Sequence, residues 1–308
     1  MPSQTLKGPR FELTIGDCGY PDALRGIEEP PPRLYGIGNP EALGPSIAVI
    51  GARKATPYGL SAAKRFAAHA ARRGVPIVSG GARGCDQEAH KAALAAHTPT
   101  VVVFGSGVDF VYPKCGFSLF QNVIDAGGAV ISENPSESPP VGFAFRRRNR
   151  IIAGLAMLVI IAEAGLPSGT FSTADAALAS DRIVAAVPGS ITSPNSKGAN
   201  YLIAQGAVPL IDEATLDAAI DAAFAHLPLS VAQAIPAGKG PKRWEQVLRA
   251  DPVLNALAAE PFNPGELCAY FGLSPAQLAS RLAQYEMDGL VERGRDGRYQ
   301  AVAGAIGA

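Results

Sequence analysis

Glycine-bearing turns recur at four places in the central part of the chain, and three of them include a cationic side chain, Arg53, Arg83 or Lys114. The four segments are Gly51-Ala52-Arg53, Ser79-Gly80-Gly81-Ala82-Arg83-Gly84, Gly105-Ser106-Gly107 with Tyr112-Pro113-Lys114 downstream, and Ser168-Gly169-Thr170. Glycine-rich turns expose backbone N–H groups, and arginine and lysine add positive charge, so both features favour phosphate oxygens. One such turn is ordinary in any α/β protein, but four together predict a phosphate-binding surface.

The glycine-rich segments do not match the phosphate motifs of nucleotide enzymes. The pattern G-x-x-x-x-G-K-[ST] is absent, and no G-x-G-x-x-G is followed by a spaced acidic residue. His90 stands one helical turn after Asp86. An Asp and a His at this spacing more often form a structural hydrogen bond that orients a loop than a general base. The sequence offers no paired carboxylates, no nucleophile with a base and no metal-ligand spacing. We therefore predict no catalytic residues, no metal and no cofactor.

The densest positive charge is the run Arg146-Arg147-Arg148-Asn149-Arg150, which precedes the apolar segment Ile151–Leu155. A charge run is usually a solvated face, but this one lies between two predicted strands whose ends should approach the glycine-rich turns. The planar guanidinium group makes paired contacts to phosphate oxygens. We therefore expect at least Arg148 and Arg150 to reach the phosphate-binding surface.

Short apolar runs precede the glycine-rich turns and are typical of buried β-strands. These runs are Ile47–Ile50, Val75–Val78, Thr100–Phe104, Ala129–Ile131, Leu158–Ile161 and Ile183–Ala186. Alanine-rich stretches of helical length lie between them, among them Gly59–Arg73, Gln87–Ala96 and Thr173–Ser180. Strands that are hydrophobic at nearly every position fit a parallel sheet with helices on both faces. The sequence thus predicts a doubly wound, Rossmann-like α/β domain, in which ligands bind at the carboxyl ends of the strands.

The composition changes after this domain. Residues 228–242 (PLSVAQAIPAGKGPK) contain three prolines and two glycines and are predicted to be a linker. Helices are then expected over Arg243–Leu257, Pro264–Phe271 and Pro275–Asp288, the last capped by Ser274, followed by a β-hairpin within Leu290–Val302. This order is that of a winged helix. The predicted domains are an N-terminal extension (1–44), the Rossmann-like domain (45–227), the linker and a winged-helix domain (243–308).

The overall composition fits a soluble chain that can bury a core: 308 residues, 47% hydrophobic and 18% charged, with a net charge of zero. Residues 45–212 carry 15 Lys and Arg against 10 Asp and Glu, which favours an anionic ligand for the central domain. The longest apolar run, Ile151–Ala162, is too short to span a bilayer, and the N-terminus lacks a secretory signal. The four cysteines form no C-x-x-C pair. We expect a cytoplasmic protein without membrane association.

The motifs resemble, in order over about residues 20–208, those of the family of the DNA-processing protein DprA, also called Smf. The similar stretches include Val49-Ile50-Gly51-Ala52-Arg53, Ser79-Gly80-x-Ala82-x-Gly84-x-Asp86, Tyr112-Pro113, Arg148-Asn149-Arg150-Ile151-Ile152-Ala153-Gly154-Leu155, Ser168-Gly169-Thr170 and Val187-Pro188-Gly189. The segment that begins at Arg148 is the most specific. The chain departs from the family pattern at Gly81 and Cys85, where aliphatic residues are usual, and at Arg146, where proline usually precedes R-N-R. The helical N-terminal domain common in the family is not found before Tyr20.

The resemblance implies a protein that binds single-stranded DNA, protects incoming DNA and loads the RecA recombinase on it during natural transformation and recombination. It also implies a homodimer formed through the Rossmann-like domain. Together with the phosphate chemistry of the turns, it assigns DNA contacts to Gly51, Arg53, Ser79, Gly80, Gly81, Arg83, Gly107, Tyr112, Lys114, Arg148, Asn149, Arg150, Ser168, Gly169 and Thr170.

Two other functions stay open. Nucleotide phosphoribohydrolases similar to the LOG proteins have a related Rossmann domain with a P-G-G-x-G-T loop and a catalytic Arg and Glu. Here the corresponding loop, Leu166-Pro167-Ser168-Gly169-Thr170, is shorter by a glycine. A nucleotide-sensing regulator would instead bind DNA through its winged helix. Residues 243–308 carry six Arg against eight Asp and Glu, however, and phosphate binding requires a cationic face.

Overall fold

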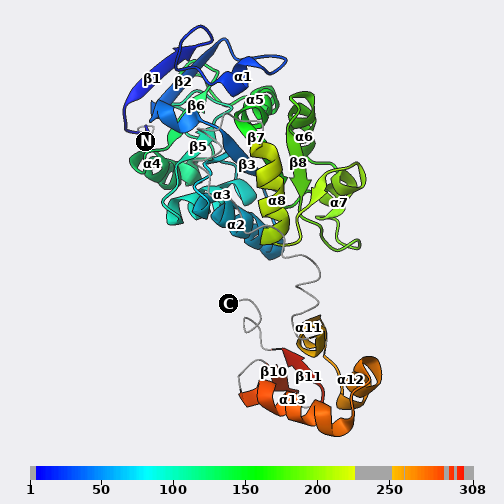
Figure 1. Cartoon of the computed structure of the whole chain (residues 1–308). Helices are drawn as coiled ribbons and strands as arrows, with labels where there is room; N and C mark the ends of the chain where they lie inside the picture. The colour runs from blue at the N-terminus through cyan, green and yellow to red at the C-terminus, as the bar shows by residue number, and fades with distance from the viewer. Residues whose placement is uncertain (1–4, 226–251, 260, 288–290, 295–296, 302–308) are drawn as a thin grey trace. The chain divides into compact units, whose positions relative to one another are not determined.

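The computed structural model of the chain describes residues 5–225, 252–259, 261–287, 291–294 and 297–301 (Figure 1). The chain forms two compact units, Met1–Gly240 and Pro241–Ala308, called here the α/β unit and the C-terminal unit. The predicted linker over residues 228–242 and the predicted start of a helix at Arg243 lie outside the described residues.

A nine-stranded sheet forms the centre of the α/β unit, in the order β1-β2-β6-β5-β4-β3-β7-β8-β9. Its strands are β1 (Arg10–Thr14), β2 (Arg33–Gly38), β3 (Ser46–Ile50), β4 (Ile77–Ser79), β5 (Thr100–Val103), β6 (Ala129–Ser132), β7 (Ala156–Ile161), β8 (Ile183–Ala186) and β9 (Val208–Pro209). The strands from β3 to β9 are parallel to one another. The chain winds from β3 toward β6 and then returns to the other side of β3 through β7, β8 and β9, which confirms the predicted doubly wound fold.

The first two strands extend the sheet in the antiparallel sense. β1 pairs with β2, and β2 pairs with β6, where Tyr35 lies opposite Ser132. The sequence did not predict these strands, and residues 1–44 were expected to be an extension that leads into the domain. They contribute instead to the same sheet, so the α/β unit has a mixed sheet with a parallel centre.

Helices cover both faces of the sheet (Figure 1). They are α1 (Asp22–Arg25), α2 (Pro57–Arg72), α3 (Cys85–Ala95), α4 (Phe117–Asp125), α5 (Gly142–Leu155), α6 (Thr170–Ala179), α7 (Lys197–Ala204) and α8 (Glu213–Phe224), with short 3₁₀ turns at Pro40–Leu43 and Lys114–Gly116. Apolar side chains of α2, α3, α4 and α8 pack on one face, and those of α1, α5, α6 and α7 pack on the other. The predicted helices correspond to α2, α3 and α6.

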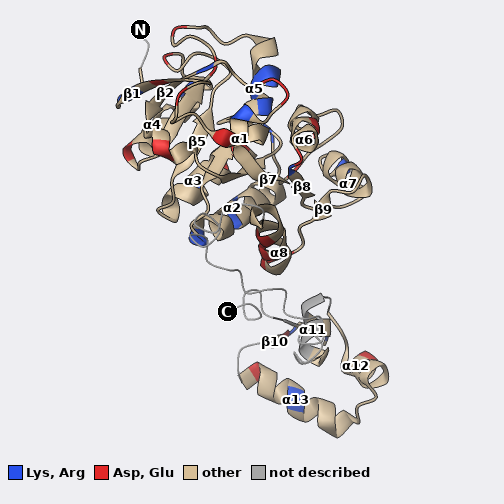
Figure 2. Ribbon diagram, turned by 45° about the horizontal axis from the view of Figure 1, so that its top comes forward, with Lys and Arg blue, Asp and Glu red and all other residues tan. Residues whose placement is uncertain are grey.

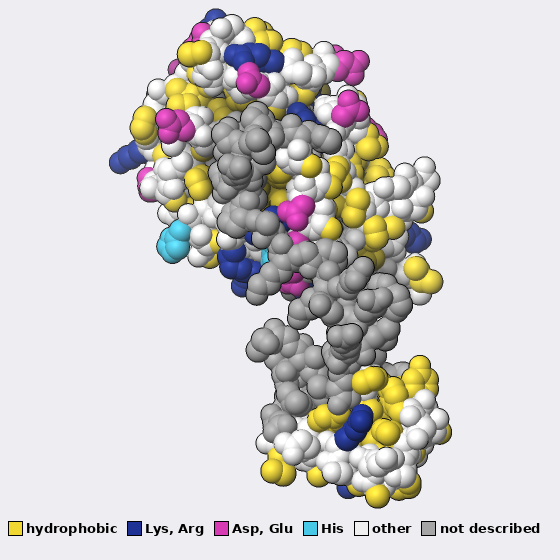
Figure 3. All heavy atoms as spheres, viewed as in Figure 1, with side chains coloured by type: hydrophobic (Ala, Val, Ile, Leu, Met, Phe, Trp, Pro, Cys, Tyr) yellow, Lys and Arg dark blue, Asp and Glu magenta, His cyan; other side chains and the backbone are white. Residues whose placement is uncertain are grey.

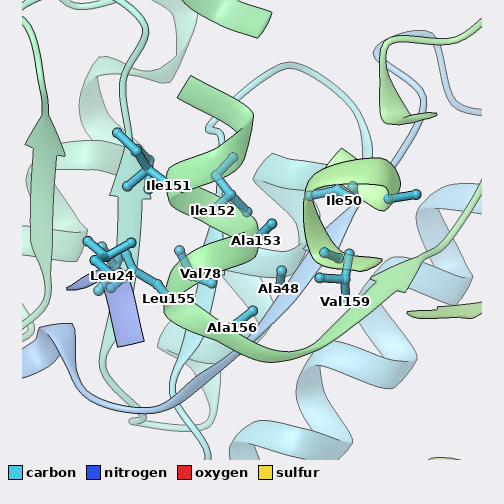
Figure 4. Packing of buried hydrophobic residues seen from close by; sticks show 14 of the residues in the cluster. Leu24, Ala48, Ile50, Val78, Ile151, Ile152, Ala153, Leu155, Ala156 and Val159 are labelled. Atoms are coloured by element: carbon cyan, nitrogen blue, oxygen red, sulfur yellow. The ribbon is translucent and has the colours of Figure 1, made fainter. Parts of the chain in front are cut away.

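The central strand β3 explains why the sequence pattern was informative. Its side chains alternate between the two faces, yet Ile47 and Val49 are buried on one face, and Ala48 and Ile50 on the other. Figure 4 shows Ile152 and Ala153 of α5 over Ala48 and Val78 of the sheet, and Leu24 of α1 beside Leu155. A strand that is covered on both faces is apolar at nearly every position.

The described residues of the C-terminal unit form three helices and a two-stranded sheet, as predicted for a winged helix. These are α11 (Pro252–Ala259), α12 (Pro264–Phe271), α13 (Pro275–Met287), β10 (Val291–Arg293) and β11 (Tyr299–Ala301). Ser274 caps α13 as expected: its Oγ accepts from the N–H of Gln277 (3.3 Å), whose Oε1 accepts from the N–H of Ser274 (2.9 Å). The face of this unit drawn in Figure 3 exposes several hydrophobic side chains.

Candidate functional site

A cavity of about 820 Å³ lies at the carboxyl ends of β3 and β7. These strands are neighbours, and the sheet winds away from them in opposite directions. Open α/β sheets bind their ligands at such a switch point. The wall of the cavity comes from the loop after β3, the loop after β7, and helix α5.

Eight of the predicted residues line this cavity, and they come from four separate segments. They are Gly51, Arg53, Tyr112, Arg148, Asn149, Ser168, Gly169 and Thr170. The other predicted residues are not part of its lining: Ser79, Gly80, Gly81, Arg83, Gly107, Lys114 and Arg150. The structure therefore brings together the first and last glycine-rich turns and part of the arginine run.

Two of the predicted residues outside the lining use their polar groups inside the protein. The Ser79 hydroxyl is buried and donates to the carbonyl of Val49 (2.7 Å). The N–H of Gly107 donates to the carbonyl of Ser138 (2.8 Å), and a Cβ at this glycine would lie 2.2 Å from carbonyl oxygens of the facing loop. Both residues set the shape of the loops beside the cavity.

Helix α5 carries the arginine run, which Figure 2 marks in blue along the ribbon, and the contacts of its arginines place them on different sides of the helix. Side chains three or four positions apart share a helix face, and the cavity is lined by Gly142, Phe145, Arg146, Arg148, Asn149 and Ile152. Arg147 and Arg150 are three apart on another side, and both pair with Glu133, at 3.4 Å and 2.7 Å. We expected Arg150 at the phosphate-binding surface, but the structure places its guanidinium on this carboxylate.

Arg148 forms the floor of the cavity. Its side chain is buried, and its Nη1 donates to the carbonyls of Gly80 (2.8 Å) and Val103. Burial lowers the pKa of the Arg148 guanidinium to about 10, while the charge of Asp86 opposes that shift. The Asp86 carboxylate accepts from the N–H groups of Gly80 (3.1 Å) and Ala82 (3.3 Å), and burial raises its pKa. A buried cation and a buried anion thus balance each other beneath the cavity.

Gly80 is required by this arrangement. A Cβ at position 80 would lie 2.5 Å from Nη2 of Arg148. Gly80 was predicted to contact phosphate, but it does not line the cavity and its N–H donates to Asp86; its missing side chain leaves space for the buried guanidinium.

Aromatic rings form one wall of the cavity. The rings of Tyr112 and Phe145 are 5.2 Å apart between centroids and inclined by 51°. The Arg53 guanidinium carbon lies 5.9 Å from the centroid of Phe145, within range of a cation–π contact. Tyr112 keeps 45% of its surface exposed. A flat group that entered the cavity could stack on this exposed ring.

The loop before α6 is held by its own side chains. The Ser168 hydroxyl accepts from the N–H of Thr170 (3.2 Å) and donates to its hydroxyl (2.8 Å). Nδ2 of Asn149 donates to Oγ of Ser172 in the first turn of α6 (2.8 Å). The N-terminus of α6 thereby opens into the cavity, where the helix dipole favours an anion.

The charged side chains that line the cavity are mostly cationic. The lining contains one carboxylate, that of Asp86, and four cations: Arg53, Lys54, Arg146 and Arg148. A lining with a net charge of about +3 is stabilised by an anionic ligand. Backbone N–H groups, cations and an aromatic wall together fit a ligand with both phosphate and flat apolar parts.

Comparisons with known proteins agree with this geometry. The family model described as DNA recombination-mediator protein A matches residues 12–220, and the model described as DprA winged helix domain matches residues 248–297. The chain belongs to the DprA (Smf) family. The first match begins within β1 and includes β2, so the antiparallel edge of the sheet is part of the DprA domain.

Relatives and solved structures show how much of the chain is shared. Protein Smf of Escherichia coli is 41% identical over 205 residues, which cover 66% of this chain and 55% of that protein, about half of its length. DprA of Streptococcus pneumoniae is 39% identical over 202 residues, 65% of this chain and 70% of that protein. Its X-ray structure has a TM-score of 0.63 over 69% of this chain and 74% of that one, at 38% identity.

A second solved structure is DprA of Helicobacter pylori, which was studied for its single-stranded DNA binding mode. It has a TM-score of 0.62 and 29% identity over 70% of this chain and 97% of that one.

The polar and aromatic residues of the cavity lining that sequence reasoning missed include Lys54, Phe145, Arg146 and Asn195. The helical period of α5 is the sequence signal that could have identified Phe145. Phe145, Arg148, Asn149 and Ile152 stand at i, i+3, i+4 and i+7, the spacing of one helix face. The sequence predicts Arg148 and Asn149 of this face but not Phe145, which stands one turn before them.

Glu163 lies in the loop after β7 but does not line the cavity. Its carboxylate is buried and accepts from the N–H (2.8 Å) and the hydroxyl (2.5 Å) of Thr56, which caps α2. Over the described ranges, His, Cys, Asp and Glu side chains form no group of three that could hold a metal ion. Within the same ranges, no helix has the length and apolarity needed to cross a membrane.

We predict that His90 makes the α/β unit sensitive to mild acid. Its ring is buried, its Nδ1 lies 2.8 Å from the Thr100 hydroxyl, and no described residue gives its Nε2 a partner. Burial lowers its pKa from 6.5 to about 3, so below pH 6.5 the unfolded chain binds a proton that the folded chain does not. The free energy of unfolding should therefore fall by up to about 1.4 kcal/mol for each pH unit between 6.5 and 3.

Urea denaturation at pH 7 and pH 5, followed by circular dichroism, measures this effect. His90→Gln should show a smaller loss between the two pH values than the parent chain. His97→Asn is the matched control, because His97 is exposed and its φ of 54° suits asparagine. Equal acid sensitivity in the parent chain and His90→Gln would contradict the prediction.

Proposed function

We propose that this member of the DprA family binds single-stranded DNA in the cavity at the switch point. The backbone of the Gly51 turn, Arg53 and the Ser168–Thr170 loop would contact phosphates, and the buried Arg148 would add positive potential from below. The observation that carries the proposal is the net positive, partly aromatic lining of one cavity. The single-stranded DNA binding mode of the Helicobacter pylori relative supports it.

The proposal extends to a cellular role. The bound chain would protect incoming DNA and load the RecA recombinase on it during natural transformation and recombination. The family description as a recombination mediator supports this role. The test is the rate at which RecA filaments assemble on DNA coated with the purified chain, against naked DNA.

We also propose a homodimer formed through the α/β unit. The edge strand β9 is short and exposed, and Ile211, two residues after it, exposes 64% of its surface. Exposed apolar side chains at a sheet edge favour association with another chain. Sedimentation velocity of the purified chain measures the oligomeric state.

The cavity in this proposal binds without turnover. The Glu163 carboxylate is held by Thr56, and the Arg148 guanidinium is held by main-chain carbonyls, so both charged groups have structural partners. Incubation with nucleoside monophosphates is the test. Multiple turnovers that Glu163→Gln abolishes would support a phosphoribohydrolase instead.

Arg53→Ala is expected to weaken single-stranded DNA binding and to make it less dependent on salt. Arg53 is exposed and lines the cavity, so its contact with a phosphate would release a counterion. The slope of log K against log salt should become shallower by roughly 0.7 for one lost contact. Fluorescence anisotropy with an oligothymidine at 50 to 200 mM salt measures both quantities.

Arg72→Ala is the control for this experiment. Arg72 is also exposed, but it stands at the last turn of α2, away from the carboxyl ends of the strands. The variant removes the same charge and should bind as the parent chain does. If Arg53→Ala matches Arg72→Ala in affinity and slope, or if duplex DNA binds better than the single strand, the proposed function is wrong.

A further inference from the structure

Two cations of the cavity lining have no part in the proposal above. Lys54 follows Arg53 in the loop after β3, and Arg146 is on the second turn of α5. Both side chains are exposed, and neither has a carboxylate within 4.0 Å among the described residues. Unpaired cations at one cavity repel each other, so their position is explained by an anion that is bound between them.

Other arginines of the same run have acidic partners. Arg147 and Arg150 of the same helix share the Glu133 carboxylate, and Arg148 is balanced by Asp86. Arg146 lies about 100° around the helix from Arg147, on the side of the cavity. The helix therefore leaves one arginine of the run unneutralised, and that arginine is at the cavity.

We propose that Lys54 and Arg146 form a second phosphate site, next to the one at Arg53, so that two neighbouring phosphates of one strand are held at this cavity. The inference rests on the proposed function, because it names a further part of the same DNA site. The site binds the DNA backbone without reading bases, since flexible cations contact phosphates of any sequence. It accounts for the positive charge that one phosphate at Arg53 leaves unbalanced.

The experiment measures the affinity of the full chain for an oligothymidine and for a mixed-sequence oligonucleotide against salt concentration. Lys54→Gln and Arg146→Gln should each make the log–log slope shallower by roughly 0.7, and the double variant by about twice that value. The affinity lost in Arg146→Gln should therefore shrink by about 2.6-fold between 50 and 200 mM salt. Arg146→Lys keeps the charge and should keep the slope.

Arg147→Gln is the matched control, because it removes the same group one residue further along α5, where the side chain pairs with Glu133 and does not line the cavity. It should leave the slope unchanged. If Arg146→Gln and Lys54→Gln behave like Arg147→Gln while Arg53→Ala weakens binding, the second site does not exist and the proposed function stands. If Arg53→Ala also has no effect, both proposals fail.

Discussion

Arg148→Met is expected to lower the free energy of unfolding of the α/β unit by about 3 to 5 kcal/mol, the usual cost of removing one member of a buried charge pair. Methionine fills much of the same volume but has no donor. The carbonyls of Gly80 and Val103 would lose the guanidinium, and Asp86 would keep a buried carboxylate without the opposite charge beneath it. Buried polar groups that lose their partner carry a desolvation cost.

Urea denaturation followed by circular dichroism measures the loss. The double variant Asp86→Asn with Arg148→Met removes both of these buried charges and should recover part of the stability, which is the signature of coupled groups. Arg53→Ala, on an exposed residue of the same cavity, should change the free energy of unfolding by less than about 0.5 kcal/mol. Equal stability of Arg148→Met and the parent chain would show that the buried guanidinium is not part of the framework.

This distinction between Arg148 and Arg53 decides how DNA-binding variants are interpreted. A variant at Arg148 would lose binding because the floor of the cavity is disturbed, whatever its own contact with DNA. Arg53 is exposed, so its removal tests the contact itself. The two arginines belong to motifs of the same family resemblance, and only their burial separates a framework residue from a contact residue.

The parallel centre of the sheet could be predicted because it is covered on both faces. β3, β5, β6 and β8 are apolar at nearly every position, short, and rich in Val, Ile and Ala, which favours buried strands of a parallel sheet. β1 and β2 could not be predicted in the same way. β1 (RFELT) is mostly exposed or half-buried at an edge, and β2 (RLYGIG) contains two glycines, so neither has a clear strand signal.

The site was predictable where chemistry follows a strand directly. Gly51 and Arg53 come at the end of β3, and the position of that strand in the sheet places them at the cavity. The residues of α5 were not predictable from the charge run alone, because a sequence does not show which side of a helix faces the sheet. The guanidinium of Arg148 lies at the floor of the cavity, whereas that of Arg150, two residues later, pairs with Glu133. That separation depends on tertiary packing.

Tyr112→Leu is expected to reduce the affinity for single-stranded DNA by about 5- to 150-fold, which corresponds to the 1 to 3 kcal/mol of one base stacked on an aromatic ring. Tyr112 lines the cavity, 45% of its surface is exposed, and Phe145 supports its ring from 5.2 Å away. Leucine keeps an apolar side chain but offers no flat face. Anisotropy titration of an oligothymidine at fixed salt measures the change.

Stacking and phosphate binding can be separated in the same titrations, because a stacked base releases no counterion. Tyr112→Leu should therefore lower the affinity at every salt concentration and leave the log–log slope of the parent chain intact, whereas Arg53→Ala changes the slope. Tyr112→Phe retains the ring and should bind within about twofold of the parent chain if the hydroxyl makes no essential contact. If Tyr112→Leu binds as tightly as Tyr112→Phe, the aromatic wall has no part in DNA binding, and the affinity of the cavity must come from its cations and backbone N–H groups.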